Sequence, residues 1–164
     1  MLLRILVFSC CCALVLVACE RPPPAANSIA VLPFERLCPE KENAFLADGI
    51  YDEVVTMLAT KVADVKVISQ KSVAKYRGIH NTQEIGRAVN VAYVLTGIVR
   101  CEAGRVHVNA QLIDTRTNAQ VWAQEYDRDL RAKVWAPEYD PASAIQSDIA
   151  KKVADQLLLR SSAK

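Results

Sequence analysis

Length, composition and charge indicate one ordinary globular domain. The chain has 164 residues, of which 52% are hydrophobic, and its 20 Lys and Arg nearly balance its 18 Asp and Glu, leaving a formal net charge of +2. A chain of this length can bury a core of useful size within a single domain. Because the basic excess is so small, nothing in the charge indicates a nucleic-acid partner.

The first nineteen residues have the pattern of a bacterial lipoprotein signal. Arg4 supplies a positive charge, an apolar run extends from Ile5 to Val15, and Leu16-Val17-Ala18-Cys19 is similar to a lipobox. The apolar run is shorter than the ~20 residues that a membrane-spanning helix needs. We therefore predict a signal peptide over residues 1–18 and lipidation of Cys19, with an ordinary secretory signal or an uncleaved anchor as the alternatives.

Residues 19–27 are expected to form a lipidated cysteine followed by a proline-rich tether. Two or three acyl chains, palmitate among them, give lasting membrane attachment where a single chain does not. A tether this short reaches only about 20 to 30 Å, which keeps the domain beside its membrane. Glu20 stands where enteric bacteria use aspartate to retain lipoproteins in the inner membrane. We expect a lipoprotein that faces the periplasm from the outer membrane.

The first half of the domain, which we place over residues 28–160, alternates strand and helix patterns. A nearly continuous apolar run over 28–34 predicts a buried strand that ends or frays at Pro33. Apolar residues recur at spacings of three and four over 43–61, which predicts an amphipathic helix. Three further elements follow: a strand over 63–69, a helical turn through 76 and a helix from 81 or 82 to 90. This order favours an α/β domain with crossover helices.

The second half is rich in strand patterns. We predict a strand over 92–101 with a kink or bulge at Gly97, a hairpin loop at 102–104, and a strand over 105–114 with one solvent-facing side. A strand over 119–126 and a helix over 142–159 complete the chain. The expected fold is α/β, a mixed sheet of about five strands in the order β-α-β-α-β-β-β-α, flanked by helices.

A short internal duplication precedes the closing helix. The segment VWAQEYD at 121–127 is echoed by VWAPEYD at 134–140. Pro137 makes the second copy a poor central strand, so we interpret it as a duplication accommodated in a loop or edge segment. The functional alternative is an exposed aromatic docking loop that presents Trp135 and Tyr139 to a partner.

The sequence carries none of the common catalytic motifs. It has no Gly-x-Ser-x-Gly elbow, no glycine loop for phosphate and no histidine pair with metal spacing. His80 and His107 are isolated, and Asp48 and Asp52 fit a solvated helix face. We expect no enzyme activity, no catalytic residues, no cofactor and no metal. Trp122 and Tyr126 are interpreted as core residues rather than a ligand platform.

Two cysteines remain for the folded domain. The cysteines at 10, 11, 12 and 19 belong to the predicted signal, which leaves Cys38 and Cys101. In an oxidising periplasm these two form a disulfide candidate, and two separate, partly buried thiols are the alternative.

Several segments together resemble the TolB N-terminal-like domain of the FlgO type. They lie in order over residues 28–159 and are SIAVLPF at 28–34, ADGI at 47–50, VKVIS at 65–69, AYVLTG at 92–97, AQLID at 110–114, WAQEYDRDL at 122–130 and AIQSDIA at 144–150. The resemblance implies a mixed sheet flanked by helices and transfers no catalytic residues. Members of the family occur beside adenylate cyclase and winged-helix segments, and one is the flagellar outer-membrane lipoprotein FlgO. Distant fold relatives include the curli secretion lipoprotein and a peptidoglycan-synthase activator.

The resemblance also bears on the cysteine pair. Cys38 and Cys101 stand where the family has polar residues, so they are departures from its pattern. If the first and third strands are parallel neighbours, both cysteines lie just past the same end of the sheet, which favours the disulfide.

We therefore expect a non-catalytic envelope lipoprotein that acts as a protein–protein interaction module, supporting a surface assembly such as the flagellum. Its partners would be the membrane, through the lipid anchor, and an envelope protein that the sequence does not identify, with self-association as a further alternative. One other function is a small-molecule sensing domain, with its site around residues 35–42, 69–72 and 100–104 at the carboxyl ends of the parallel strands. The other is a peptidoglycan-synthase activator, which the short tether disfavours.

Overall fold

The computed structural model describes residues 22–38, 45–79, 81–129 and 141–161. The predicted signal peptide, the lipidation residue Cys19 and the aromatic pair Trp135 and Tyr139 lie outside these ranges. Within the described part of the chain, no helix combines the length and the apolar character that crossing a bilayer requires.

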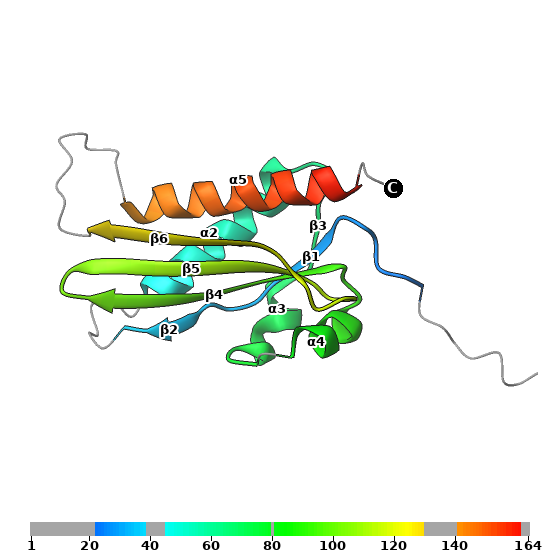
Figure 1. Cartoon of the computed structure of the whole chain (residues 1–164), viewed down its shortest axis with the longest axis horizontal. Helices are drawn as coiled ribbons and strands as arrows, with labels where there is room; N and C mark the ends of the chain where they lie inside the picture. Colours follow the sequence, from blue (N-terminus) through cyan, green and yellow to red (C-terminus); the bar gives the residue numbers. More distant parts are fainter. Residues whose placement is uncertain (1–21, 39–44, 80, 130–140, 162–164) are drawn as a thin grey trace, which may run out of the picture.

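One mixed sheet organises the domain, with helices on both of its faces (Figure 1). The strands follow the order β3-β1-β4-β5-β6, and β2 pairs with β4 as a continuation of the β1 side. Their bounds are β1 Ser28–Val31, β2 Glu35–Leu37, β3 Lys66–Val67, β4 Tyr93–Glu102, β5 Arg105–Asp114 and β6 Gln120–Asp129. The predicted α/β class with a mixed sheet is confirmed.

The parallel part of the sheet is built around β1. Ile29 pairs in register with Val67 of β3 on one side and with Tyr93 of β4 on the other. All four residues of β1 are buried, as expected for a central strand covered on both faces. The first and third predicted strands are therefore parallel neighbours.

The apolar run at 28–34 forms only one short strand, and a second strand that we did not predict follows it. β1 ends at Val31, the chain passes Pro33 without pairing, and β2 then resumes parallel pairing with β4 through Glu35 opposite Ile98. Pro33 cannot donate a backbone hydrogen bond, so the ladder is interrupted at this point. This interruption gives six strands instead of about five.

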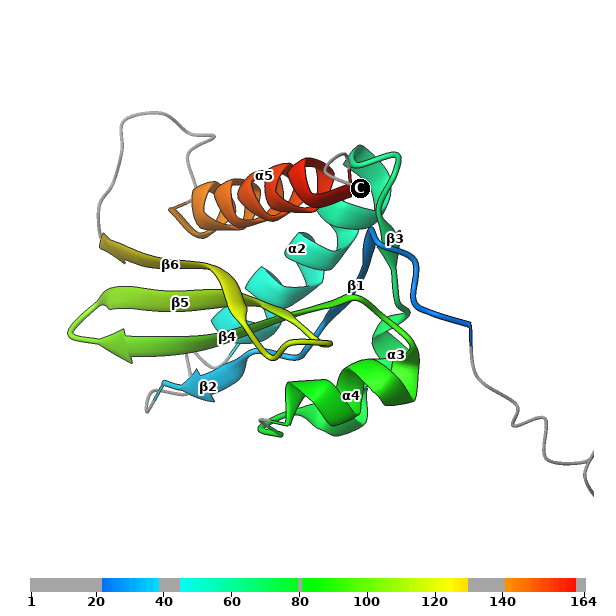
Figure 2. The same ribbon diagram turned by 45° about the vertical axis from the view of Figure 1, so that its right-hand side comes forward.

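Two long helices cover one face of the sheet. They are α2, Leu46–Lys61, and α5, Pro141–Ser161, which pack beside each other over β4, β5 and β6 (Figure 2). Their inward residues are fully buried and form the main core with the sheet, including Ile50, Val54, Leu58, Ile145, Ile149, Val153 and Leu157. Burying a side chain of this size stabilises the fold by about 1.5 to 3 kcal/mol, which makes this layer the main source of stability.

Shorter helical segments cover the opposite face at one end of the sheet (Figure 2). They are α3 Gln70–Val73, the 3-10 turn η3 Ala74–Tyr76, and α4 Thr82–Val89. The predicted caps of α4 are present: the Asn81 side chain accepts the Glu84 N–H at 3.2 Å, and Asn90 adopts the left-handed conformation at φ 55°. These segments bury a second, smaller cluster that includes Leu32, Val73 and Ile85.

The last three strands form the predicted meander, but Gly97 is not a bulge. It pairs regularly with Ala110, and the register shift lies instead between Leu112 and Ile113, opposite β6. A Cβ added at Gly97 would lie 2.9 Å from the Phe34 ring. Gly97 is therefore explained by close packing of Phe34 against the β4 backbone.

Candidate interaction surfaces

The carboxyl ends of β1 and β3 were one predicted site for a small ligand. Here Arg77 donates to Asp48 at 2.7 Å and to the Phe34 carbonyl at 3.0 Å. Gln70 donates to Asp52 at 2.9 Å. The two aspartates are exposed to solvent, as expected, and they also tie α2 to the segment after β3.

The hollow at this end has a volume of about 270 Å³ and is lined by Glu35, Arg36, Asp48, Arg77 and Gly78. Of the three predicted segments, 35–38 and 100–102 lie side by side through the β2–β4 register. Gln70, which belongs to the remaining predicted segment 69–72, contacts α2 instead. The arrangement supports the fold more directly than it supports a ligand, because Arg77 and Asp48 of its lining are already paired with each other.

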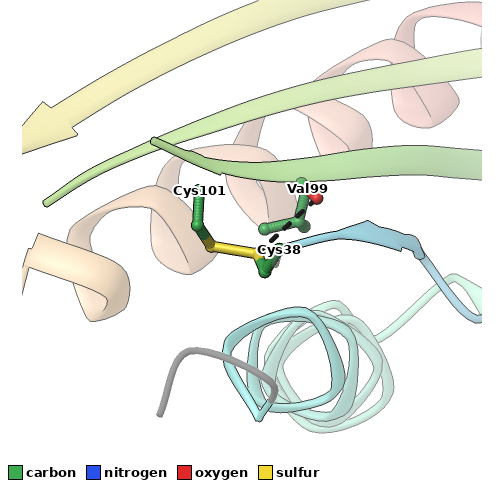
Figure 3. The surroundings of a disulfide bond; sticks show 3 residues. All are labelled: Cys38, Val99 and Cys101. Carbon is green, nitrogen blue, oxygen red and sulfur yellow. Dashed lines mark hydrogen bonds between the residues drawn. A yellow bond between two sulfur atoms is a disulfide. The ribbon is translucent and has the colours of Figure 1, made fainter. Parts of the chain in front are cut away.

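Cys38 and Cys101 are joined by a disulfide (Figure 3). Their Cα atoms are 4.6 Å apart, and the bond links residues 63 positions apart in the sequence. The Sγ atom of Cys38 also lies 3.9 Å from the Val99 carbonyl oxygen. Because Leu37 pairs with Arg100, the next residue on each strand is a cysteine, so the bond fixes the end of β2 to β4.

A groove separates the outer sides of α2 and α5. It has a volume of about 370 Å³, and its apolar lining comes from Met57 and Val62 of the α2 side and from Ala150, Ala154 and Leu158 of α5. Lys151 and Asp155 add one charge of each sign. Leu158 is 40% exposed, so this groove has apolar surface open to solvent.

The outer face of the meander is polar. Arg105 approaches Asp127 at 2.8 Å, and the Nδ1 atom of His107 lies 3.6 Å from the same carboxylate. His107 is thus on the solvent-facing side of β5, as predicted, and it contacts a neighbouring strand. Among the described residues no three His, Cys, Asp or Glu side chains gather in a cluster that could hold a metal ion.

Two buried tyrosines belong to the core between the sheet and its long helices. Tyr51 is 6% exposed and Tyr126 is 4% exposed, and neither hydroxyl has a hydrogen-bond partner in the part of the chain that the structure describes. Burial, with a smaller contribution from Asp52, raises the pKa of Tyr51 to about 12. Burial also raises the pKa of Tyr126, and Asp148 adds to this rise. Tyr126 therefore packs in the core as predicted, and the partly buried Trp122 packs against the same core cluster.

The structure brings together one predicted pair, Cys38 and Cys101, while Cys19, Trp135 and Tyr139 lie outside the described residues. Our sequence reasoning missed the role of Arg77. No spacing in the sequence links Arg77 to Asp48, because the two meet only after β3 and α3 fold back along α2. It also missed that Arg87, Arg116 and Arg160, from three separate parts of the fold, lie near the tether.

The chain matches a known family and a curated relative. The family model described as the HilA/YgeH-like transcriptional regulator, second domain, matches residues 25–136. The protein described as "Putative adenylate cyclase 3" of Rhizobium meliloti (strain 1021) is 41% identical over 113 residues, which is 67% of this chain and 19% of that protein. The chain thus spans about a fifth of the length of this relative.

Solved structures share the fold. Lipoprotein GNA1162 from Neisseria meningitidis has a TM-score of 0.56 at 15% identity, covering 79% of this chain and 97% of its own. TolB from Acinetobacter baumannii has a TM-score of 0.57 at 18% identity, covering 85% of this chain and 30% of its own. The LpoB C-terminal domain from Salmonella enterica has a TM-score of 0.51 at 16% identity, covering 71% of this chain and 91% of its own.

These likenesses establish a TolB-like fold, and they do so at the level of fold alone. The family model matches more than half of the 164 residues. This match is stronger evidence for the family than a likeness in fold at low sequence identity. The chain belongs to the family of HilA/YgeH-like transcriptional regulator second domains.

Proposed function

We propose that this protein is a non-catalytic envelope lipoprotein whose domain acts by binding another protein. The observation that carries the proposal is that one domain recurs in different settings. It matches a part of a longer protein described as an adenylate cyclase, and it matches the second domain of a regulator family. A domain that is combined with different neighbours fits a binding module better than an active site.

The envelope setting rests on two further observations. The lipobox-like segment ends at Cys19, directly before the proline-rich tether. The structural match to a solved lipoprotein, GNA1162, covers 97% of that chain, so a single domain of this fold makes up nearly all of that structure. Both support a domain held at a membrane by its N-terminal cysteine, facing the periplasm, with the outer membrane as its proposed location.

The proposal includes the FlgO-type assignment and a role in a surface assembly such as the flagellum. Its support is the set of segments over residues 28–159 that resemble that type. The α2–α5 groove and the polar outer face of the meander are the two candidate surfaces for a partner. The small-molecule alternative has less support, because Arg77 and Asp48 already neutralise each other at the predicted ligand end.

Photo-crosslinking in living cells tests the binding function. A crosslinking amino acid is placed at Met57 in the groove, at Gln111 on the outer sheet face, or at Lys71 on α3 as a control position, in the full chain. We expect one envelope protein to be captured repeatedly from Met57 or Gln111 and not from Lys71. Capture from all three positions of the same abundant lipoproteins, in proportion to their abundance, would contradict the proposal. A captured flagellar protein would extend the FlgO-type resemblance to a shared role.

A further inference from the structure

The tether lies against one end of the domain. Residues 22–24 line two neighbouring hollows, of about 150 Å³ and about 390 Å³, whose other walls come from the end of α4, the turn between β5 and β6, and the end of α5. Figure 1 shows these elements together on the right-hand side, where residues 22–27 run into β1. This end of the domain is therefore the one nearest the predicted lipid anchor.

Hydrogen bonds fix the direction in which the tether leaves. The Ser28 N–H donates to the Ala25 carbonyl at 2.9 Å, and the buried Ser28 hydroxyl donates to the same carbonyl at 2.5 Å. The Ser28 hydroxyl also accepts the Ala92 N–H at 2.9 Å. The side chain of Asn27, the residue before Ser28, donates to the Asp64 carbonyl and so holds Asn27 to the turn before β3. The tether is thus attached to the domain up to Ala25.

Three arginines surround this exit. Arg116 in the β5–β6 turn lines both hollows, Arg160 in the last turn of α5 lines the smaller one and Arg87 in the last turn of α4 lines the larger one. All three are exposed. The Arg116 side chain is 76% exposed. We call these three residues the tether-side arginine face.

Asp114 lies beside these arginines. Asp114 is the single acidic residue among the described residues that line the two hollows. Its side chain is only 15% exposed, and its Oδ1 atom accepts the N–H groups of Arg116 and Thr117 within the turn. Asp114 therefore shapes the turn, and its Oδ2 atom also pairs with Arg116 Nη2 at 3.9 Å.

The distance to the predicted anchor is short. Pro22 stands three positions after Cys19, which at about 3.1 Å per residue allows a reach of about 10 Å. This exceeds the Debye length of about 8 Å at physiological ionic strength, so these charges act on the membrane only when the short tether lets this end of the domain touch its surface. Guanidinium groups also bind phosphate oxygens with two hydrogen bonds at once.

From this geometry we propose that the tether-side arginine face docks on anionic lipid head groups and sets the orientation of the domain on its membrane. The inference rests on the proposed lipid anchor. Docking turns the opposite end of the sheet, with the β4–β5 hairpin and the disulfide, away from the membrane and toward partners. Each arginine near an anionic surface is expected to increase the docked population by about fivefold.

Hydrogen–deuterium exchange on vesicles tests the proposal with the lipidated full-length protein. One set of vesicles contains phosphatidylcholine alone, and the other also contains phosphatidylglycerol. We expect amides of the 115–118 turn and of the end of α4 to exchange about fivefold or more slowly on the anionic vesicles than on the neutral ones. A triple variant, Arg87→Glu, Arg116→Glu and Arg160→Glu, is expected to lose this difference. A control with the same charge change, Lys71→Glu, Arg100→Glu and Arg128→Glu, is expected to keep it.

The outcomes separate the docking from the anchor. Flotation with neutral vesicles shows that the anchor holds, and absence of flotation overturns the anchor and the docking together. Flotation with equal exchange on both kinds of vesicle overturns the docking alone. Equal loss in the two triple variants also overturns it, because the effect would then come from net charge. The comparison between vesicles uses the wild-type chain, so it decides even if a variant does not fold.

Discussion

Tyr51 shows how a single buried group makes the stability depend on pH. Tyr51 lies on α2, its buried hydroxyl has no partner among the described residues, and burial raises its pKa to about 12 from an ordinary value of 10. Because the folded state holds the proton more tightly than the unfolded state, the stabilising contribution is complete below about pH 10 and is lost as the pH rises toward 12.

The Tyr51→Phe variant tests this description. At neutral pH we expect the variant to be more stable, with a free energy of unfolding about 1 kcal/mol higher than that of the wild type, because an unpartnered buried hydroxyl is removed. Between about pH 10 and pH 12 the wild type should lose stability more steeply, by up to about 1.4 kcal/mol per pH unit. Urea unfolding at several pH values measures both effects. Parallel pH profiles for the two proteins would show that the Tyr51 hydroxyl does not titrate as described.

At the scale of elements, the disulfide holds a strand that has little else to hold it. β2 has three residues, two of them exposed, and it pairs only at the end of β4. A crosslink over 63 positions of sequence stabilises the fold by up to about 4 kcal/mol through the entropy of the unfolded chain.

We expect the double variant Cys38→Ser, Cys101→Ser to lose up to about 4 kcal/mol of unfolding free energy. Amide exchange should increase most in residues 35–37, and much less in β5, whose partners on both sides remain in place. Urea unfolding of the oxidised, the reduced and the double-variant protein measures the change. Identical midpoints for the oxidised and reduced forms would show that the bond adds no stability.

The same scale shows which elements the sequence could predict. α4 was predictable at both ends because its caps are local, with Asn81 three residues before Glu84 and Asn90 directly after Val89. α5 was predictable because its apolar residues recur at helical spacing. β2 was not, because the residues Glu35, Arg36 and Leu37 have no strand pattern and pair only where β4 extends beyond β1. Gly97 was misinterpreted because the contact that requires a glycine there is also distant in the sequence: the Phe34 ring belongs to a residue 63 positions away.

At the scale of the whole molecule, the order of the elements predicted the layers. Alternating strands and helices followed by a meander lead to a sheet with parallel strands at one side and antiparallel strands at the other, and this is the order observed. The candidate surfaces were less predictable. The tether-side arginine face and the Arg77 contacts each join residues from separate elements, and no local spacing encodes them.

The two ends of the domain have different proposed roles. The tether and its arginines lie at one end, and the disulfide-bonded end of β2 and β4 lies at the other. The outer face of the meander lies between these ends, and the α2–α5 groove extends along α5 toward the tether end, where Leu158 stands two residues before Arg160. A domain anchored at one end can present these surfaces to a partner in the periplasm. The whole account therefore depends on attachment through Cys19.

The most direct test is the chemical state of the N-terminus of the mature protein. We predict that mass spectrometry of protein taken from the envelope finds Cys19 as the first residue, carrying acyl groups, and that the protein incorporates labelled palmitate. The Cys19→Ser variant should lose the label and leave the membrane fraction. A mature chain that begins elsewhere without acyl groups, or a Cys19→Ser variant that keeps both the label and the membrane location, would contradict the account.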